Sequence, residues 1–286
     1  MARVYTFTVT QPCTVKIFLR RRCGLSSRMV IRLKQEAAGI TVNGEHARVI
    51  DPLAVGDKVV LKMPEESDDS PGIHAPISVV WEDEDFLVID KPAALPIHPS
   101  AGHESDALSL RVRGYYAARG EKTAFRPLYR LDKDTSGLVV AAKNSYAAAA
   151  ASLEKTYFGV CEGEITKPGT IDRPIGLLPG HSIQRGCVDW GQPAVTHFKP
   201  IQSDGKHTLL RFHLETGRTH QIRVHMASIG HPLVGDDFYG GSLAQISRQA
   251  LHCGEAVLYF PPLEKSLHFK ASFPDDLCRA FPSLFD

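Results

Sequence analysis

The first part of the chain alternates between helical and extended hydrophobic patterns. Apolar residues recur at helical spacing in two stretches, 15–19 and 29–33, which are separated by a glycine and two serines. Residues three and four apart share one helix face, so this spacing predicts two short amphipathic helices. Residues 39–44 then alternate and end in an Asn-Gly turn, and 53–61 is typical of a further turn and strand.

Longer hydrophobic segments follow, and most of them are extended. Residues 77–89 carry two apolar runs around an acidic turn, which predicts a β-hairpin. The stretches 138–142, 156–161 and 207–214 are also typical of strands, whereas the alanine-rich segment 144–154 predicts a helix. Because strands mix with short helices and form no regular βαβ repeat, we expect an α+β fold rather than a doubly wound sheet.

An acidic, proline-containing segment separates the two patterns. Residues 64–76 (PEESDDSPGIHAP) show no periodicity, so we expect them to link two domains. The predicted domains are residues 1–63 and 77–286. A chain of 286 residues with 43% apolar content can bury a substantial core, and its length is close to that of two average domains.

Composition excludes several classes of protein. No apolar run approaches the roughly 18 residues that a membrane-spanning helix needs, and the N-terminus lacks a signal-peptide layout, so we expect a cytoplasmic protein without a membrane partner. The six cysteines are dispersed without a C-x-x-C pair, which predicts reduced thiols and no structural zinc site. The sequence has no heptad repeat and no strong apolar stripe, so we expect a monomer.

Positive charge is concentrated in one segment. The net charge is only +1, but residues 16–34 contain no acidic residue. A run of charge is usually a solvated face, yet two basic helices followed by turns of the matching type favour RNA binding. The basic residues concerned are Lys16, Arg20, Arg21, Arg22, Arg28, Arg32 and Lys34.

The same segment carries four short motifs in a recognisable order. They are Phe18-Leu19, a serine-led second helix at Ser26-Ser27-Arg28, Val42-Asn43-Gly44 and Gly56-Asp57. In this order the segment resembles the S4 RNA-binding domain. The resemblance implies a small α/β domain over residues 1–63 with RNA as its partner.

Polar residues 129–138 (YRLDKDTSGL) run directly into a predicted strand. A carboxylate at the start of a strand can be held rigidly and still reach a pocket, so Asp132 is a candidate catalytic group. The segment resembles the signature H-R-L-D-x-x-T-S-G-L of the RluA-type family of pseudouridine synthases. Two further segments match that family in order: 89–99 (IDKPAALPIHP), and 217–240, which contains G-R-T-H-Q-I-R.

The resemblance implies an RNA pseudouridine synthase without cofactor or metal, whose catalytic domain has a mixed, mainly antiparallel sheet. Such an enzyme breaks the N1–C1′ bond of uridine, turns the uracil over and joins C5 to C1′. The resemblance assigns the catalytic carboxylate to Asp132, its guanidinium partner to Arg223 and an active-site tyrosine to Tyr157. Carboxylates attack sugar carbons in other enzymes, and a guanidinium keeps a carboxylate charged through two parallel hydrogen bonds. Tyr129 and Ala94 stand where the family has histidine and glycine.

Five further residues are implied in substrate binding. Arg130 resembles the arginine that fills the base stack when the target uridine is flipped out, with a surface salt bridge as the alternative. Leu251 falls where the family places an apolar residue beneath the base, and core packing explains it equally well. Arg218 is a phosphate contact or a structural anchor, and Lys91 and His98 support the pocket or contact phosphate.

Other activities explain the sequence less well. His220, His225 and His231 cluster with Asp236 and Asp237, but the first two histidines are five residues apart rather than four, which argues against a zinc hydrolase. The sequence contains no G-x-S-x-G motif of a serine hydrolase. A catalytically silent RNA-binding or ribosome-assembly protein is the alternative from another class. Large-subunit ribosomal RNA is the expected substrate, with transfer RNA as the alternative.

Overall fold

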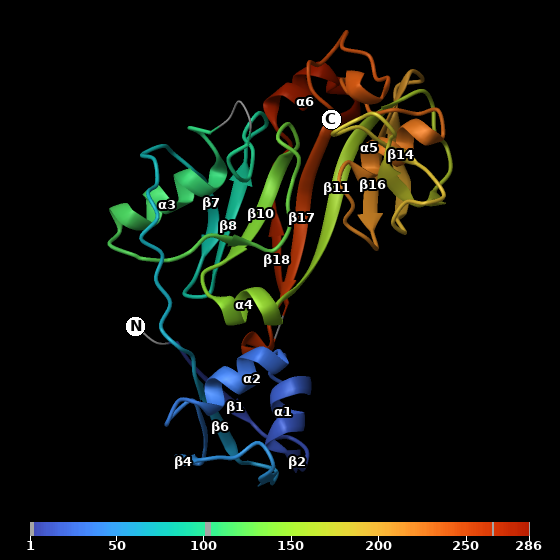
Figure 1. Ribbon diagram of the computed structural model, residues 1–286. Helices are drawn as coiled ribbons and strands as arrows, with labels where there is room; N and C mark the ends of the chain where they lie inside the picture. The colour runs from blue at the N-terminus through green and yellow to red at the C-terminus, as the bar shows by residue number, and fades with distance from the viewer. Residues whose placement is uncertain (1–2, 101–103, 265, 286) are drawn as a thin grey trace.

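The chain folds into two stacked units. The computed structural model describes residues 3–100, 104–264 and 266–285. A small unit is formed by residues 3–63 and a large unit by the residues from 77 onward, and the long strands of the large unit point towards the small unit at one end (Figure 1). Within these described ranges no helix is long and apolar enough to cross a membrane.

The small unit is a four-stranded antiparallel sheet with two helices. Its elements are β1 (Val4–Thr8), β2 (Cys13–Thr14), α1 (Val15–Arg21), α2 (Ser27–Lys34), β3 (Ile40–Val42), β4 (Glu45–His46), β5 (Pro52–Leu53) and β6 (Lys58–Lys62). The sheet has the order β1-β6-β3-β4, and β2 pairs with β5. The two predicted helices are confirmed. Each is capped by a hydroxyl oxygen, because Thr14 accepts from the N–H of Ile17 and Ser26 from that of Met29.

The large unit is built on one ten-stranded sheet. Its strands are β7 (Ser78–Glu82), β8 (Phe86–Lys91), β9 (Arg126–Pro127), β10 (Ser136–Ala142), β11 (Ser152–Glu162), β12 (Gly169–Asp172), β15 (Val195–Ser203), β16 (His207–Leu214), β17 (Leu251–Tyr259) and β18 (Ser266–Lys270). They run in the order β12-β15-β16-β11-β17-β10-β8-β7, with β18 beside β17 and β9 beside β10. Among the strands that the structure describes, only β10 and β17 pair in parallel, so the expected mixed, mainly antiparallel sheet is confirmed.

Helices and a two-stranded hairpin lie around this sheet. The remaining elements are α3 (Leu108–Ala118), α4 (Ser145–Ala150), β13 (Ile175–Leu177), β14 (Arg185–Cys187), α5 (Gln221–Ser228), η1 (Asp237–Tyr239), η2 (Pro261–Leu263), α6 (Asp275–Ala280) and α7 (Pro282–Phe285). Helix α3 lies at the β7 edge, and α5 lies beside β16 near the opposite edge (Figure 1). The centre of the sheet, where β10, β17 and β11 lie next to one another, therefore separates the two groups.

Most predicted elements of the large unit are confirmed, but one helix is shorter than expected. The hairpin at 77–89 and the strands at 138–142, 156–161 and 207–214 are present. The helix predicted over 144–154 ends at Ala150, and the last residues of that segment belong to β11. They are drawn into the sheet because β11 pairs with β17 from its first residue onward, and this pairing overrides the helix preference of a short alanine-rich segment.

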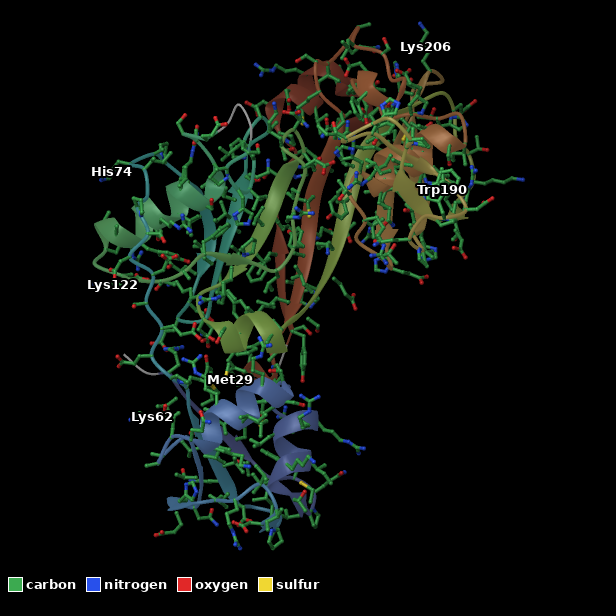
Figure 2. All side chains as sticks on the ribbon, in the orientation of Figure 1. Met29, Lys62, His74, Lys122, Trp190 and Lys206 are labelled. Carbon is green, nitrogen blue, oxygen red and sulfur yellow. The ribbon has the colours of Figure 1, made fainter. Side chains whose placement is uncertain are left out.

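The segment between the units contains no helix or strand, yet it is fastened to the large unit. Residues 64–77 run along α3, and Asp69 lies 2.9 Å from the ammonium group of Lys122. Figure 2 shows this path from Lys62 in the small unit to His74 beside α3, with Lys122 next to it. The expected linker is therefore ordered by contacts with the large unit.

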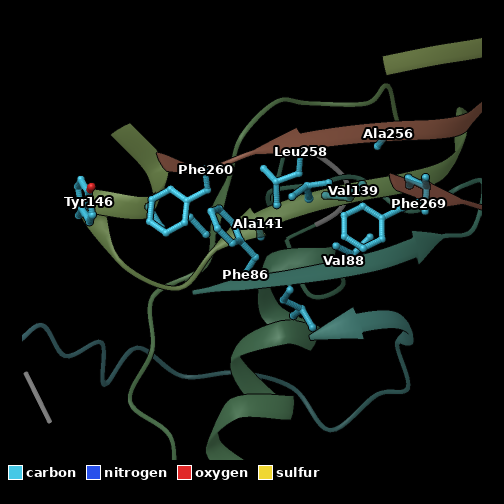
Figure 3. Packing of buried hydrophobic residues seen from close by; sticks show 14 of the residues in the cluster. Phe86, Val88, Val139, Ala141, Tyr146, Ala256, Leu258, Phe260 and Phe269 are labelled. Atoms are coloured by element: carbon cyan, nitrogen blue, oxygen red, sulfur yellow. The ribbon is translucent and has the colours of Figure 1, made fainter. Parts of the chain in front are cut away.

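Aromatic side chains join the two units in one continuous core. Figure 3 shows Tyr146 and Phe260 at one end of the apolar layer formed by β8, β10 and β17. The ring of Tyr5 in β1 lies 4.8 Å from Tyr146 and 5.9 Å from Phe260. Its hydroxyl donates to the buried carboxylate of Asp85, which also accepts from Asn144 Nδ2 at 2.8 Å. The small unit is thus held by a buried polar network inside an aromatic cluster.

Candidate active site

Asp132 lies in the loop that leads into the central strand β10. The backbone N–H of Thr135 donates to Asp132 O at 3.1 Å, which closes a turn around the carboxylate. Gln249 Nε2 donates to the hydroxyl of Thr135 at 3.2 Å. All residues of β10 are buried, so the loop enters a rigid strand, as the sequence predicted. Thr135 therefore braces the turn that carries Asp132, and it also lines the pocket beside it.

Two basic side chains hold the loop from behind through its carbonyl groups. Lys91 Nζ donates to Lys133 O at 2.9 Å and to two carbonyls of its own loop, and the whole residue is buried, which lowers its pKa to about 7. Arg248 Nη1 donates to Asp134 O at 3.2 Å, while its other nitrogens bind Asp276 at 2.6 and 2.9 Å. Lys91 therefore braces the loop that carries Asp132, and its burial leaves no access for a phosphate.

Arg223 faces Asp132, but its main partner is a different carboxylate. Arg223 Nη1 lies 3.4 Å from Asp132 Oδ2, whereas its Nε and Nη2 donate to the two oxygens of Asp236 at 2.7 and 2.8 Å. The expected pair of parallel hydrogen bonds is therefore made with Asp236 and not with Asp132. Burial alone would lower the pKa of Arg223, but the hydrogen bonds to Asp236 and the charge of Asp132 raise it above its ordinary value. The guanidinium remains charged.

The start of α5 positions this guanidinium. Gln221, the first residue of α5, is buried; its Oε1 accepts from the N–H of Arg218 at 2.9 Å, and its Nε2 donates to Val195 O at 2.9 Å. Arg218 Nε itself donates to Pro193 O at 3.0 Å. These contacts tie the helix start to β15, and they favour the structural-anchor alternative for Arg218.

His220 occupies the N-cap position of α5, and its ring is the second polar side chain that faces Asp132. Its Nε2 lies 4.0 Å from Asp132 Oδ1, and its Nδ1 lies 2.9 Å from the hydroxyl of Tyr239. Burial lowers the pKa of His220, partly opposed by the charge of Asp132. From the sequence, His220 and Asp236 were interpreted only as possible metal ligands. Both lie in the segment 217–240 that resembles the family, and this position was the sequence feature that could have indicated a place in the active site.

Tyr157 and Leu251 form the apolar floor of the same pocket. They lie on the neighbouring strands β11 and β17, where Tyr157 is opposite Cys253 and Leu251 opposite Gly159. Burial raises the pKa of Tyr157 well above its ordinary value, so its hydroxyl is protonated at neutral pH. The complete lining of this Asp132 pocket is Arg130, Leu131, Asp132, Thr135, Tyr157, Leu214, Arg218, His220, Gln221, Ile222, Arg223 and Leu251.

The two departures from the family pattern lie outside this lining. The hydroxyl of Tyr129 donates to Leu138 O and lies 3.7 Å from Cys253 Sγ, so it fastens the loop to β10. Ala94 has a φ of 62°, a left-handed conformation that glycine adopts without cost. Ala94 therefore keeps the backbone conformation of the turn, at a conformational free-energy cost on the order of 1 kcal/mol.

Arg130 lines the Asp132 pocket, and His98 lies close enough to Arg130 for its pKa to respond to that charge. Arg130 is exposed, and no hydrogen bond or ion pair of its guanidinium is found within the described ranges. His98 is also exposed; partial burial and the nearby charge of Arg130 lower the pKa of its imidazole. Both positions are accessible to RNA.

The basic side chains of α1 and α2 differ in whether they already have a partner within the protein. Arg22 Nη2 lies 2.6 Å from Glu264 Oε1 in the large unit, so this side chain joins the two units. Arg20 Nη1 donates to Leu25 O at 2.6 Å. Arg32 lies 3.9 Å from Glu66. The exposed members of the set are Lys16, Arg20, Arg21, Arg28, Arg32 and Lys34.

Two of the three clustered histidines have structural contacts. His225 is buried and uses both ring nitrogens, with Thr196 Oγ1 and Arg173 O each at 2.9 Å. His231 Nδ1 lies 2.7 Å from Glu162 O. No group of three or more potential ligands arranged to hold a metal is found among the residues that the structure describes.

A larger cavity of about 630 Å³ lies apart from the Asp132 pocket. It is lined by residues of β8, the start of α3 and the Arg248–Asp276 pair, and shares no lining residue with that pocket. Lys91 and Arg248 separate it from the loop of Asp132. The carboxylate chemistry therefore belongs to the smaller pocket.

Comparison with known proteins agrees with this geometry. The family model described as RNA pseudouridylate synthase matches residues 85–228. The chain belongs to the RNA pseudouridine synthase family. It is an enzyme of that family, and the RluA-type resemblance of its motifs is supported by relatives named ribosomal large subunit pseudouridine synthase D.

Relatives of this family cover most of the chain. The uncharacterized RNA pseudouridine synthase YjbO of Bacillus subtilis is 36% identical over 90% of this chain and 94% of its own length. Ribosomal large subunit pseudouridine synthase D of Escherichia coli K12 is 38% identical over 71% of this chain and 68% of its own length. The solved structure of human RNA pseudouridylate synthase domain containing 1 has a TM-score of 0.58 and 26% identity, over 75% of this chain and 89% of that one.

Proposed function

We propose that the enzyme isomerises specific uridines of large-subunit ribosomal RNA, with Asp132 as the catalytic carboxylate. The observation that carries the proposal is the placement of Asp132 between Arg223 and His220, above the floor formed by Tyr157 and Leu251. A carboxylate that faces a guanidinium can act on the sugar while the side chains of Tyr157 and Leu251 hold a flat base. The names of the ribosomal relatives support the choice of RNA.

The proposed chemistry uses only groups of the chain and the substrate. Asp132 acts at C1′ as the N1–C1′ bond breaks, and uracil leaves with the bonding electrons. The uracil turns over, C5 joins C1′, the proton on C5 leaves and N1 takes up a proton, so that the overall reaction is an isomerisation. Tyr157 lies against the base, and because burial raises its pKa it keeps its own hydrogen firmly; it can accept the C5 proton only after giving up that hydrogen. No cofactor is required.

Substrate RNA is bound across both units in this proposal. Residues 1–63 act as an S4-like RNA-binding domain through the exposed basic residues of α1 and α2, and Arg130 fills the stack that the flipped uridine leaves. His98 contacts phosphate beside it. We further propose that the enzyme acts as a monomer in the cytoplasm, since the sequence has no heptad repeat and no strong apolar stripe.

Pseudouridine mapping tests the proposal. Ribosomal and transfer RNA from cells with and without the gene are labelled with carbodiimide and read by primer extension. We expect one or a few sites in large-subunit ribosomal RNA to lose pseudouridine, and wild type but not Asp132→Asn to restore them. Lost sites in transfer RNA alone would refute the choice of RNA, and restoration by Asp132→Asn would refute the catalytic role and favour a binding protein.

A further inference from the structure

His220 occupies an uncommon backbone conformation at the edge of the Asp132 pocket. It precedes α5 with a φ of 59°, in the left-handed region that only a few per cent of non-glycine residues adopt, although asparagine, aspartate and histidine do so more often than the others. Its side chain makes no capping hydrogen bond to the helix. The ring is instead packed edge-on against Tyr239, with 5.7 Å between the ring centres. A residue kept in such a conformation by its surroundings points to a function for its side chain.

Hydrogen bonds to Tyr239 set the tautomer of this imidazole. The hydroxyl oxygen of Tyr239 accepts the backbone N–H of Arg185 at 3.2 Å and lies 2.9 Å from His220 Nδ1. The phenol hydrogen can be donated to Nδ1, and in the arrangement that we assign here Nδ1 carries no hydrogen. A neutral imidazole then bears its hydrogen on Nε2. That hydrogen lies on the side of the ring that faces Asp132.

The two oxygens of Asp132 consequently face two different donors. Oδ2 lies 3.4 Å from Arg223 Nη1, and Oδ1 lies 4.0 Å from His220 Nε2. Both distances are longer than a good hydrogen bond, as is common in sites without substrate, where catalytic contacts shorten on binding. A neutral donor on Oδ1 orients the carboxylate without adding a second full positive charge that would weaken its reactivity.

We propose that His220 is a positioning residue for the reaction: when RNA fills the pocket, its Nε2–H donates to Asp132 Oδ1 while Arg223 holds Oδ2. The inference rests on the proposed catalytic role of Asp132. Held on both oxygens, the carboxylate cannot rotate away from the sugar carbon. Tyr239 takes part indirectly, since it fixes the imidazole tautomer and also lies beneath the guanidinium of Arg223, 5.0 Å from its central carbon.

Two substitutions of His220 separate positioning from folding. His220→Asn suits the left-handed backbone, and its short amide reaches the place of Nδ1 beside Tyr239 but not Asp132. His220→Gln places an amide N–H near the position of Nε2. The substrate is a large-subunit ribosomal RNA transcript labelled with tritium at uracil C5, which releases tritium when C5 is joined to C1′. Single-turnover rate, KM and melting temperature are measured for each variant.

We expect His220→Asn to lower the single-turnover rate about 100-fold, the scale of a small misplacement of a reacting group, with KM within about twofold of wild type. His220→Gln should recover at least about tenfold of that loss. Tyr239→Phe, which frees the tautomer, should lower the rate by about three- to tenfold and serves as the second test if the glutamine strains the turn. His197→Asn is the control, because His197 in β15 is paired with Glu215. We expect its single-turnover rate to equal that of wild type.

Three outcomes would overturn the inference. A wild-type rate in His220→Asn would remove any role in catalysis. Equal losses in both His220 variants with a matching fall in melting temperature would make His220 merely structural, as would a loss that appears only in KM. Asp132→Asn is run beside them: if it releases tritium, the proposed function itself fails, whereas a silent Asp132→Asn with a normal His220→Asn rejects only the role of His220.

Discussion

Arg223 makes its two short hydrogen bonds with Asp236 and only a longer contact with Asp132. Two of its nitrogens donate to the carboxylate of Asp236 at 2.7 and 2.8 Å, and only Nη1 is left to face Asp132 at 3.4 Å. The side chain of Asp236 is 1% exposed and that of Arg223 is 10% exposed, so the ion pair is largely shielded from solvent. Its function is to fix the guanidinium in place, which leaves the Asp132 carboxylate free to change partners during the reaction.

Removing the charge of Asp236 should therefore harm both stability and activity. We expect Asp236→Asn to lower the free energy of unfolding by about 3 kcal/mol, because a buried guanidinium loses its counter-charge. Urea denaturation measures this, and tritium release from C5-labelled RNA should fall in parallel. Asp69→Asn is the matched control: it breaks an exposed pair with Lys122, and we expect a cost of about 0.5 kcal/mol or less. Equal effects of the two changes would contradict the assigned role of Asp236.

The junction between the units should depend on the hydroxyl of Tyr5. It donates to the buried carboxylate of Asp85, so Tyr5→Phe leaves that charge with one donor fewer. We expect a loss of about 2 kcal/mol in the free energy of unfolding, measured by urea denaturation, and faster proteolytic cleavage within residues 64–76. The exposed Tyr259 provides the control, since Tyr259→Phe changes the same atom on the surface. Identical urea midpoints for the two variants would show that the network adds little to the junction.

RNA affinity should distinguish the arginines of the two N-terminal helices. Arg21→Ala and Arg28→Ala remove exposed charges, and each should reduce the slope of log affinity against log salt by about 0.7 to 0.9 if it contacts one phosphate. Arg22→Ala should leave that slope nearly unchanged, because Arg22 is paired with Glu264 of the large unit. Filter binding over a series of potassium chloride concentrations measures the slopes. The S4-like role of this segment would be rejected if none of the three slopes moved.

Acid should destabilise the protein through His252. This buried histidine is bonded to Ser136, and burial together with the charge of Arg248 lowers its pKa to about 4. Between that value and the ordinary value near 6.5 the unfolded chain binds more protons, so stability falls as pH drops through this window, by about 3 kcal/mol in total.

The matched measurement compares wild type with His252→Asn by urea denaturation from pH 7 to pH 4. His220 and His225, whose pKa values are also lowered by burial, are present in both proteins. The difference in slope therefore belongs to His252, and wild type should lose stability more steeply. Parallel curves would mean that protonation of His252 has no part in acid sensitivity.

The local elements and the motif that carries Asp132 could be predicted from the sequence alone. Helical spacing found α1 and α2, alternation found β16, and the polar loop before β10 was identified because a turn-rich segment ran into a continuous apolar strand. These features depend on residues within a few positions of one another. The boundary between α4 and β11 was missed for the opposite reason, because pairing with a strand about a hundred residues away decided it.

Which charged side chains form ion pairs became known only from the three-dimensional fold. Arg223 lies 13 residues from Asp236 and 91 from Asp132, and nothing in that spacing says which carboxylate takes the two short hydrogen bonds. Lys91 is buried and donates to a carbonyl of the loop that carries Asp132. Arg22 pairs with Glu264 because the small unit packs against the large unit. Partners of a charged side chain are chosen by desolvation and by the exact positions of distant strands, and both arise only when the sheet is assembled.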